Sequence, residues 1–180
     1  YNAITTFAMC SMYAYLTVSP YLLQVKVGLS PEMFGYTNLL VSGTLVISSY
    51  VNSKMIYHRG IDKMLHTGVI LLGISGVLFL LCGIFNEFYI YTIIIPLIIM
   101  VWGCGFIYPN ASAGGLSLFS KSAGTAGAVY ACVQMLGGSA GSGFISLMSH
   151  YGNPLACLGL LVILQALVGM SFTKKLLLKS

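Results

Sequence analysis

The polar and aromatic side chains inside long apolar stretches are the residues of this chain best suited to contact a ligand. Gln134 lies near the middle of one such stretch, Asn38 in a second, Tyr13 and Tyr15 in a third, and Trp102 in a fourth. Amides can orient a bound molecule by hydrogen bonds, and aromatic rings stack on ligands of varied shape. We expect these residues to line a substrate cavity. The alternative for each is an interhelical hydrogen bond or simple packing.

No Asp, Glu, Lys or Arg lies in the middle of these stretches. The three acids, Glu32, Asp62 and Glu87, fall at the ends of the apolar stretches, and so do Arg59 and the lysines. Proton relays and ion sites inside a membrane normally need ionisable groups at mid-depth. A carboxylate that couples transport to protons is therefore expected outside these 180 residues.

No catalytic or metal site is predicted. The segment Gly137–Gly143 has a superficial likeness to a loop of membrane serine proteases, but Ala140 stands where the G-x-S-G pattern needs glycine. His150 follows Ser142 by only eight residues and lies near the end of its apolar stretch. The five cysteines form no C-x-x-C pair, so neither a zinc site nor a disulfide framework is indicated. We expect a protein that is not an enzyme and needs no cofactor.

The elements that position these residues are predicted to be membrane-spanning helices. Only 6% of the residues are charged, against roughly 25% in soluble domains. Such a chain must be solvated mainly by lipid, and a helix needs about 20 largely apolar residues to cross a bilayer. Stretches that qualify lie at about residues 3–23, 34–57, 65–85, 88–108, 123–148 and 154–172. We predict an all-α membrane protein with six transmembrane helices in one bundle, because the stretches lack the alternation of β-barrel strands.

Residue types at the ends of these stretches support the boundaries. Ser30-Pro31-Glu32 supplies a cap, a proline at the first helical position and an acid in the first turn. Asn153-Pro154 opens the sixth span. Asp62 is expected to cap the third span and Ser122 the fifth.

The positive charges predict how the spans are oriented. Four of the eleven charged residues lie in the segment 52–64, between the second and third spans. If this loop is cytoplasmic, alternation places seven of the eight Lys and Arg residues on that side and leaves Lys26 outside. Such an excess is typical of cytoplasmic loops, so both ends of the segment are expected in the cytoplasm. The net charge of +5 comes without a basic stripe, so no nucleic-acid partner is expected.

Glycines and one proline set the region of the fourth and fifth spans apart. Pro109 disfavours helical geometry at Tyr108, where the fourth span is expected to end. Gly124 and Gly127, and then the pair Gly137/Gly141, have the spacings of tightly packed helices. Two interpretations stay open, which are static close packing and a helix pair that slides during alternating access.

Several short motifs follow one another along the chain. They are Ser19-Pro20, Gly28-Leu29-Ser30-Pro31, Phe34-Gly35-Tyr36, Asn52, Arg59-Gly60, Pro109-Asn110-Ala111, Phe119, Gly124-Thr125-Ala126-Gly127-Ala128 and Gln134. In their order and spacing the chain resembles the C-terminal six-helix half of a major facilitator superfamily transporter, and within it the bicyclomycin-resistance (Bcr/CflA-type) drug–proton antiporters. The cytoplasmic loop signature of the superfamily is degraded here, because Asp62 follows Gly60 and does not precede Arg59.

This resemblance implies one half of a two-bundle transporter in the bacterial inner membrane, built as a pair of inverted three-helix repeats. Its partner would be the N-terminal six-helix half of the same transporter, and the two would export small amphipathic molecules or drugs in exchange for protons. The first, second, fourth and fifth spans would face the cavity or the other half, and the third and sixth would face lipid. Conformational or motif roles would fall to Asn52, Arg59, Gly60, Asp62, Pro109, Asn110, Gly124 and Gly127.

Two alternatives remain open. The first is a carrier of the same superfamily with another cargo, such as a siderophore, a sugar or a metabolite, because a few cavity residues set the substrate. The second is a stand-alone six-span protein that self-associates through its glycine-rich fifth span into a channel or scaffold.

Overall fold

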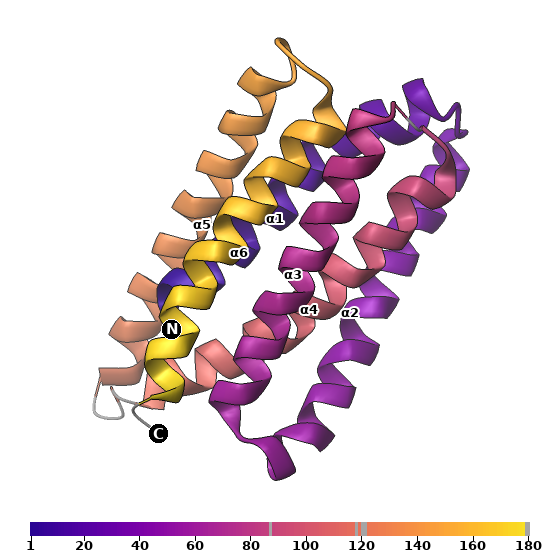
Figure 1. Cartoon of the computed structure of the whole chain (residues 1–180). Coiled ribbons are helices and arrows are strands. Elements are labelled where there is room, and N and C mark those ends of the chain that lie inside the picture. The colour runs from indigo at the N-terminus through magenta and orange to yellow at the C-terminus, as the bar shows by residue number, and fades with distance from the viewer. Residues whose placement is uncertain (87, 118, 120–121, 179–180) are drawn as a thin grey trace.

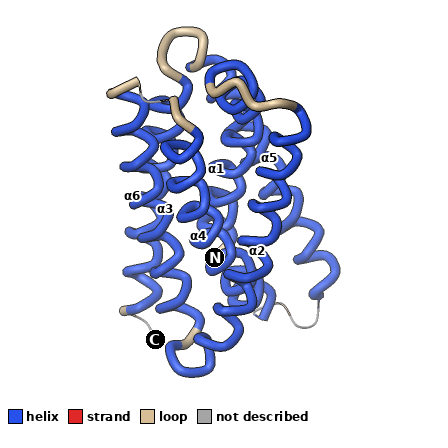
Figure 2. Tube along the Cα trace, turned by 90° about the vertical axis from the view of Figure 1, so that its right-hand side faces the viewer, coloured by secondary structure: helices blue, strands red, loops and turns tan. Residues whose placement is uncertain are grey.

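The computed structural model describes residues 1–86, 88–117, 119 and 122–178. Within these residues the chain forms long helices that run side by side along one bundle (Figure 1). They are α1 (Asn2–Pro20), α2 (Pro31–Arg59), α3 (Ile61–Ile84), α4 (Ile90–Ser117), α5 (Ala123–Met148) and α6 (Pro154–Leu177), with a π-helical turn, η1 (Tyr21–Lys26), directly after α1. All regular structure in the described part of the chain is helical, which confirms the all-α prediction (Figure 2).

Four of the helices, α2, α3, α4 and α6, are long and apolar enough to cross a membrane. Helices α1 and α5 do not reach that hydropathy, because hydroxyl side chains and glycines interrupt their apolar residues. The prediction of apolar spanning helices is therefore confirmed for four, and the predicted number of six spans is not.

The helices form two layers. Helices α2, α4, α1 and α5 lie side by side in that order, and α3 and α6 pack against each other and cover α4 and α1 (Figure 1). The main packing pairs all join one of the first three helices to one of the last three: α1 with α5, α2 with α4, α3 with α6 and α4, and α6 with α1. Exchanging α1 with α4, α2 with α5 and α3 with α6 leaves this set of pairs unchanged.

The layer of α3 and α6 is held together by close backbone approach. A Cβ at Gly76 would lie 2.9 Å from the backbone nitrogen of Ile163, and one at Gly159 would overlap the backbone of Leu80. The opposite faces of both helices expose aliphatic side chains, which are Ile70, Ile74, Val77 and Leu81 on α3 and Leu160, Leu164, Leu167 and Val168 on α6. That the third and sixth spans face lipid stays a prediction, because α2 and α5 also expose apolar side chains.

Two helix caps occur as predicted. Ser30 begins α2, and its hydroxyl accepts a hydrogen bond from the backbone nitrogen of Met33 at 3.3 Å. Asn153 begins α6 in the same way, with Leu155 N donating to Asn153 Oδ1 at 2.9 Å. In both cases the side chain satisfies a backbone donor that the first helical turn leaves free.

The two other predicted caps are wrong. Helix α3 is capped by Gly60, whose φ of +78° turns the chain sharply between α2 and α3, and no side chain caps it. Asp62 therefore lies within the first turn and not before it, where its carboxylate accepts a hydrogen bond from the Tyr1 hydroxyl at 2.7 Å. Ser122 does begin α5, but its side chain makes no capping hydrogen bond.

Helix α4 continues past the expected break. It runs through Pro109 to Ser117, two turns beyond the predicted end at Tyr108. Ile107 and Ala111, on either side of the proline, are completely buried, and Asn110 Nδ2 donates to the Phe106 carbonyl at 2.7 Å. Packing and this side-chain hydrogen bond outweigh the local preference, as they commonly do for proline in buried membrane helices.

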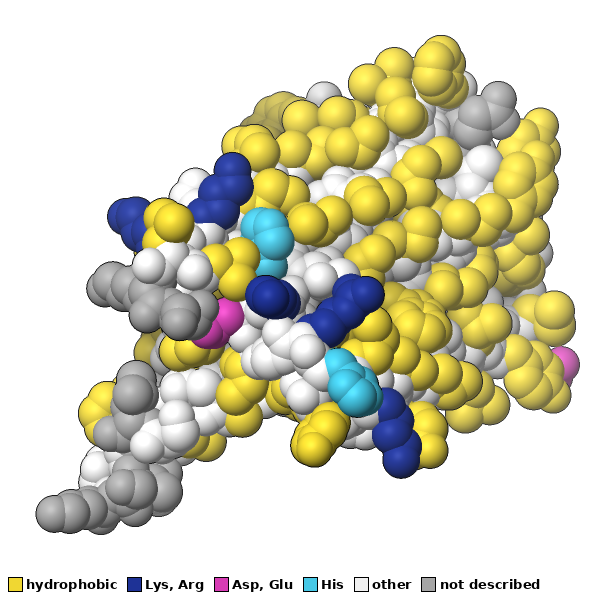
Figure 3. Space-filling view, turned by 60° about the horizontal axis from the view of Figure 1, so that its bottom comes forward, with side chains coloured by type: hydrophobic (Ala, Val, Ile, Leu, Met, Phe, Trp, Pro, Cys, Tyr) yellow, Lys and Arg dark blue, Asp and Glu magenta, His cyan; other side chains and the backbone are white. Residues whose placement is uncertain are grey.

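Most of the charged side chains of the described residues lie at one end of the bundle. Figure 3 shows Lys, Arg and His side chains around the α2–α3 turn and the end of α6, surrounded by a hydrophobic surface. The exposed cations at this end are Lys54, Arg59, Lys63, Lys174 and Lys175, whereas Lys26 lies at the opposite end. Lys121 and Lys179, which belong to the predicted cytoplasmic group, lie outside the described residues, as does Glu87.

Candidate functional site

Tyr13 lies where α1 crosses α5. Its ring packs directly on Gly138, so that ring atoms lie 3.1 Å from where a Cβ at that glycine would be. Its hydroxyl is 3.7 Å from the sulfur of Met135, one turn earlier on α5. A larger residue at position 138 would push the ring away, so the glycine sets the position of Tyr13 at mid-helix.

Gln134 and Trp102 are both half-buried and open to further contacts. Gln134 precedes Met135, and within the described chain its side chain makes no hydrogen bond. Trp102, on α4, packs edge-to-face on Phe106 with 6.0 Å between ring centroids. An unoccupied amide and a partly exposed indole can contact a ligand, so the cavity role of these residues stays a prediction.

Tyr15 does not belong with them. It is 1% exposed and packs in the hydrophobic core, which contradicts its predicted place in a cavity wall. Successive helical residues are rotated by about 100°, so Tyr15 points away from the face that carries Tyr13. Asn38 is also separate, because its Nδ2 donates to the Phe34 carbonyl of its own helix at 3.3 Å and not across to another element.

Tyr108 is a residue that the sequence reasoning missed. Its hydroxyl oxygen is buried and has no hydrogen-bond partner among the described residues. It lies close enough to the Cys104 thiol and the Tyr13 hydroxyl to interact with both electrostatically. The predicted end of α4 at Tyr108 placed this side chain at the membrane surface, whereas the longer helix carries it into the bundle beside Tyr13.

Two of the motif residues meet in the interior. Asn52 on α2 and Asn110 on α4 are 2% and 0% exposed, and Asn110 Nδ2 donates to Asn52 Oδ1 at 2.7 Å. A turn away, the same two helices touch at Gly105, where a Cβ would overlap the hydroxyl of Ser48. The glycine thus permits the close approach that brings the two amides into contact.

The other motif residues lie at the charged end or on the surface. Arg59 and Pro109 are exposed, and Gly60 forms the turn described above. Asp62 joins α3 to the start of α1 through Tyr1. Burial, together with the hydrogen bond to Asp62, raises the pKa of the Tyr1 phenol to about 12.

The glycines of α5 fall into two groups. Gly137 and Gly141 contact α1, and a Cβ at Gly141 would lie 2.5 Å from the Cys10 carbonyl oxygen. At Gly124 and Gly127 no described atom lies within 4 Å of a Cβ position. Tight packing is therefore confirmed for the second pair, whereas the first pair faces open space in this chain.

A further polar contact joins α1 to α6. Gln165 is 8% exposed; its Oε1 accepts from the Ser11 hydroxyl, and its Nε2 lies 2.7 Å from the Cys10 sulfur. The amide is thus fully used between helices. Gln165 therefore makes interhelical hydrogen bonds, whereas Gln134 makes none among the described residues.

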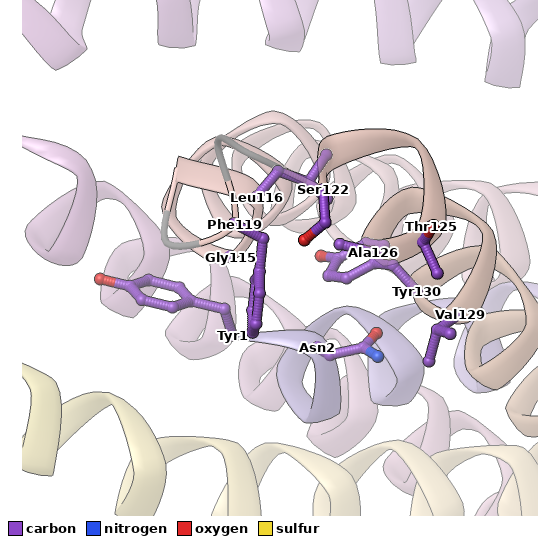
Figure 4. Close-up of a pocket in the computed structure, with 10 residues that line it drawn as sticks. All are labelled: Tyr1, Asn2, Gly115, Leu116, Phe119, Ser122, Thr125, Ala126, Val129 and Tyr130. Carbon is purple, nitrogen blue, oxygen red and sulfur yellow. The ribbon is translucent and has the colours of Figure 1, made fainter.

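A cavity of about 470 Å³ lies at the charged end of the bundle (Figure 4). The first turn of α1, the end of α4 and the first turns of α5 border it, and it is open on one side. It is lined by Tyr1, Asn2, Gly115, Leu116, Phe119, Ser122, Thr125, Ala126, Val129 and Tyr130. The sequence reasoning did not predict this cavity, because its walls come together from segments more than 100 residues apart.

The carboxylates of the described chain are those of Glu32 and Asp62, each in the first turn of its helix. Mid-depth positions of the described helices therefore carry hydroxyls, amides, thiols and rings in place of acids. In the same residues no three His, Cys, Asp or Glu side chains converge to hold a metal ion.

Comparison with known proteins shows similarity to one curated protein over part of the chain. Over 111 residues the chain is 27% identical to "Multidrug resistance protein D" of Escherichia coli (strain K12). The match covers 62% of this chain and spans 28% of the length of that relative. No protein-family model matches the chain, and no solved structure matches it. The apolar helices indicate an integral membrane protein, and part of its sequence is similar to a protein named for multidrug resistance.

Proposed function

We propose that this chain is half of a major-facilitator-type secondary transporter that exports small amphipathic molecules or drugs. The observation that carries the proposal is the two-layer bundle, in which α2 and α5 are largely uncovered by other helices. It is combined with similarity to a protein named for multidrug resistance. In this reading all six helices span the membrane, and the end that carries Arg59, Lys63 and Lys174 lies in the cytoplasm.

The arrangement of the helices supports a pair of inverted repeats. Helices α1–α3 and α4–α6 exchange places without changing which helices pack together. Inverted repeats of three helices are the building units of many secondary transporters, with the substrate held near the bilayer midplane. Helices α1 and α4 would then border the cavity, while α2 and α5 would contact the N-terminal half.

The uneven burial of the helices agrees with this division. Of the 18 consecutive residues that are most apolar in each helix, 22% are buried in α2 and 56% in α4. Helix α5 buries little beyond Gly138, Gly141 and Ile145, all on its α1 side. Two helices at the opposite edges of one layer thus remain largely uncovered, as a second six-helix bundle would require.

The substrate site would lie around Tyr13, Trp102 and Gln134. Tyrosine, tryptophan and the soft side chain of Met135 suit ligands of varied shape, and Gln134 supplies an orienting hydrogen bond. Tyr108 adds a buried hydroxyl near Tyr13 and the Cys104 thiol. No carboxylate of the described helices lies at this depth, so the proton-coupling acid is assigned to the other half.

Transport by the complete polypeptide, reconstituted in vesicles, tests the proposal. Gln134→Ala and Trp102→Ala are expected to change the range of exported dyes and drugs or to lower efflux several-fold. Gln165→Ala is a matched control for stability loss, because its amide is used in packing. Unchanged substrate range and efflux rate in both cavity variants would disprove the site assignment.

A panel of chemically diverse cargo separates drug export from a carrier of siderophores, sugars or metabolites. Cross-linking in membranes separates either carrier from a six-span oligomer. Cysteine pairs that join α5 of one copy to α5 of another at high yield would favour the oligomer and count against a partner half.

A further inference from the structure

We propose that the groove between α3 and α6 binds one phospholipid with an anionic headgroup, whose phosphate is held by Lys63 and Lys174. The groove has a volume of about 360 Å³ and is formed by these two helices alone. Part of an acyl chain can lie in it, and basic side chains between helices at a membrane surface bind the phosphates of anionic lipids. The inference needs this face to meet lipid, as the proposed arrangement has it, but it does not depend on transport.

Small residues form the floor of the groove. A Cβ at Gly73 of α3 would lie 3.4 Å from both Ala166 Cβ and Met170 Cε of α6, so the glycine leaves a shallow place between the helices. Larger aliphatic side chains border this floor, which are Ile70, Ile74 and Val77 on α3 and Ile163 and Leu167 on α6. No residue that lines the described groove has a polar side chain, as suits a hydrocarbon chain.

The two lysines lie in line with the groove. Residues seven positions apart in an α-helix point in nearly the same direction, because two turns take about seven residues. Lys63 precedes Ile70 by seven residues, and Lys174 follows Leu167 by seven residues. Both lysines are exposed and lie at the charged end, where Figure 3 shows basic side chains beside a hydrophobic surface. Each helix thus places one cation above its side of the groove.

Contacts between α3 and α6 bring these two positions together. His66 Nδ1, one turn from Lys63, lies 2.7 Å from Oγ1 of Thr173, the residue directly before Lys174. The helices also touch further along, since a Cβ at Gly169 would lie 3.1 Å from a methyl carbon of Val69. Lysine has a long and flexible side chain, so the two ammonium groups can converge on one phosphate.

Distances along the helices match a phospholipid. At 1.5 Å per residue the groove extends about 12 Å along α3, from Ile70 to Leu78, and Lys63 lies about 10 Å before Ile70. When the lysines lie at the level of the headgroups, the groove therefore lies at the depth of the acyl chains.

The described acids leave positive charge in excess beside the groove. Glu32 begins α2 at the opposite end of the bundle. The Asp62 carboxylate accepts a hydrogen bond from the Tyr1 hydroxyl at 2.7 Å, and its side chain points about 100° away from that of Lys63, the next residue. An anionic headgroup is therefore favoured over a zwitterionic one.

Native mass spectrometry of the complete polypeptide in detergent can count the lipids that it retains. The probes are dioleoyl phosphatidylglycerol, which is anionic, and dioleoyl phosphatidylcholine, which has the same chains and no net charge. We expect the parent to prefer phosphatidylglycerol and Lys63→Gln/Lys174→Gln to retain one molecule fewer. The affinity of this site should fall about 25-fold, since each lysine near a membrane surface contributes about fivefold. Glycerol phosphate, which has no chains, should not displace the lipid.

A second lysine pair is the matched control for charge. Lys54→Gln/Lys175→Gln removes the same charge at the same end of the bundle. However, Lys54 lies over the Tyr50 ring on α2, and Lys175 lines a different hollow together with Tyr1. This control should retain phosphatidylglycerol as the parent does.

A glycine variant tests the groove separately from the charges. Gly73→Leu fills the floor and should weaken phosphatidylglycerol binding several-fold with both lysines in place. Gly43→Leu is its control, because no described atom lies within 4 Å of a Cβ at that position. The lysine variants change only exposed side chains, so they test the site even if Gly73→Leu fails to fold.

Equal retention by the parent and Lys63→Gln/Lys174→Gln would overturn the inference. Equal losses in the two lysine pairs would also overturn it, because they would indicate a response to surface charge alone, and so would equal retention of the two lipids by the parent. A polypeptide that exports drugs without this lipid preference refutes only the lipid site. A polypeptide that shows the expected variant pattern but exports nothing keeps the lipid site and refutes the proposed function.

Discussion

Asn52 and Asn110 form a buried pair of amides between α2 and α4, with Asn110 Nδ2 2.7 Å from Asn52 Oδ1 and Asn52 Nδ2 3.4 Å from Asn110 Oδ1. Each amide therefore acts as both donor and acceptor toward the other. This is the main polar contact of α2, which is the least buried of the four helices apolar enough to cross a membrane. It fixes the position of α2 along α4.

Removing one amide of this pair should destabilise the bundle. Asn52→Leu leaves the Asn110 amide without its partner in a dry interior, at a cost of about 1–3 kcal/mol. The double variant Asn52→Leu/Asn110→Leu should cost less than the sum of the single variants, because no amide is left unpaired. Thermal unfolding in detergent gives the four values of the cycle, and strictly additive effects would show that the pair is not coupled.

Gly105 should tolerate no side chain. In Gly105→Ala the new methyl group overlaps the Ser48 hydroxyl, and relief requires α2 to move. Such overpacking costs about 1–3 kcal/mol. Gly43→Ala is the control, since no described atom lies within 4 Å of its Cβ position, and it should be neutral or slightly stabilising. Equal melting temperatures for the two variants would contradict the tight α2–α4 contact.

The contact between α1 and α5 makes a parallel prediction. Gly141→Ala places a methyl group 2.5 Å from the Cys10 carbonyl oxygen, whereas Gly143→Ala, half a turn away, meets open space. We expect Gly141→Ala to lower the free energy of unfolding by about 1–3 kcal/mol and Gly143→Ala to leave it nearly unchanged. Urea or thermal unfolding of both purified variants checks the difference.

The two interior glutamines should behave in opposite ways. Gln165→Leu breaks the contacts with Ser11 and Cys10 and should destabilise the chain by about 1–3 kcal/mol. Gln134→Leu removes a half-buried amide that has no hydrogen bond in the described chain, so the fold should keep its stability. Comparison of unfolding curves suffices, and a larger loss for Gln134→Leu would reverse the assignment of the two residues.

Alkaline pH should weaken the link between α1 and α3. The pKa of the Tyr1 phenol is raised from 10.0 to about 12 by burial and by its hydrogen bond to Asp62. The unfolded chain therefore loses this proton first, and stability present below pH 10 falls as the pH rises towards 12. Tyr1→Phe has no phenol to ionise, so the difference in melting temperature between parent and variant should shrink over that interval. A constant difference would contradict the raised pKa.

Much of the helical framework follows from the sequence, because long apolar stretches and end signals are local properties. The bounds of α5 are those predicted, and Ser30 and Asn153 cap their helices as expected. Local rules failed at Pro109 and at Asp62. At Pro109, burial and the hydrogen bond from Asn110 to Phe106 keep α4 continuous, and at Asp62 the turn at Gly60 decides where α3 begins.

The site was less predictable, since it depends on which way each side chain points. Tyr13 and Tyr15 are the same residue type only two positions apart, yet Tyr13 contacts α5 and Tyr15 is buried in the core. Helix α1 has apolar residues on every side, so its sequence gives no clear direction. The pairing of Asn52 with Asn110 and the position of Tyr108 likewise require knowledge of neighbours far along the chain.

The packing of early helices on late ones has a consequence for synthesis. Thr17 hydrogen-bonds to Ser142, 125 residues later, and Ser11 to Gln165, 154 residues later. When α1, α2 and α3 leave the ribosome, their main partners do not yet exist, and the Ser11 and Thr17 hydroxyls can bond only to carbonyls of their own helix. The bundle therefore cannot mature helix by helix from its first residue. Its native contacts close only when α6, the last helix of this bundle, arrives beside α3.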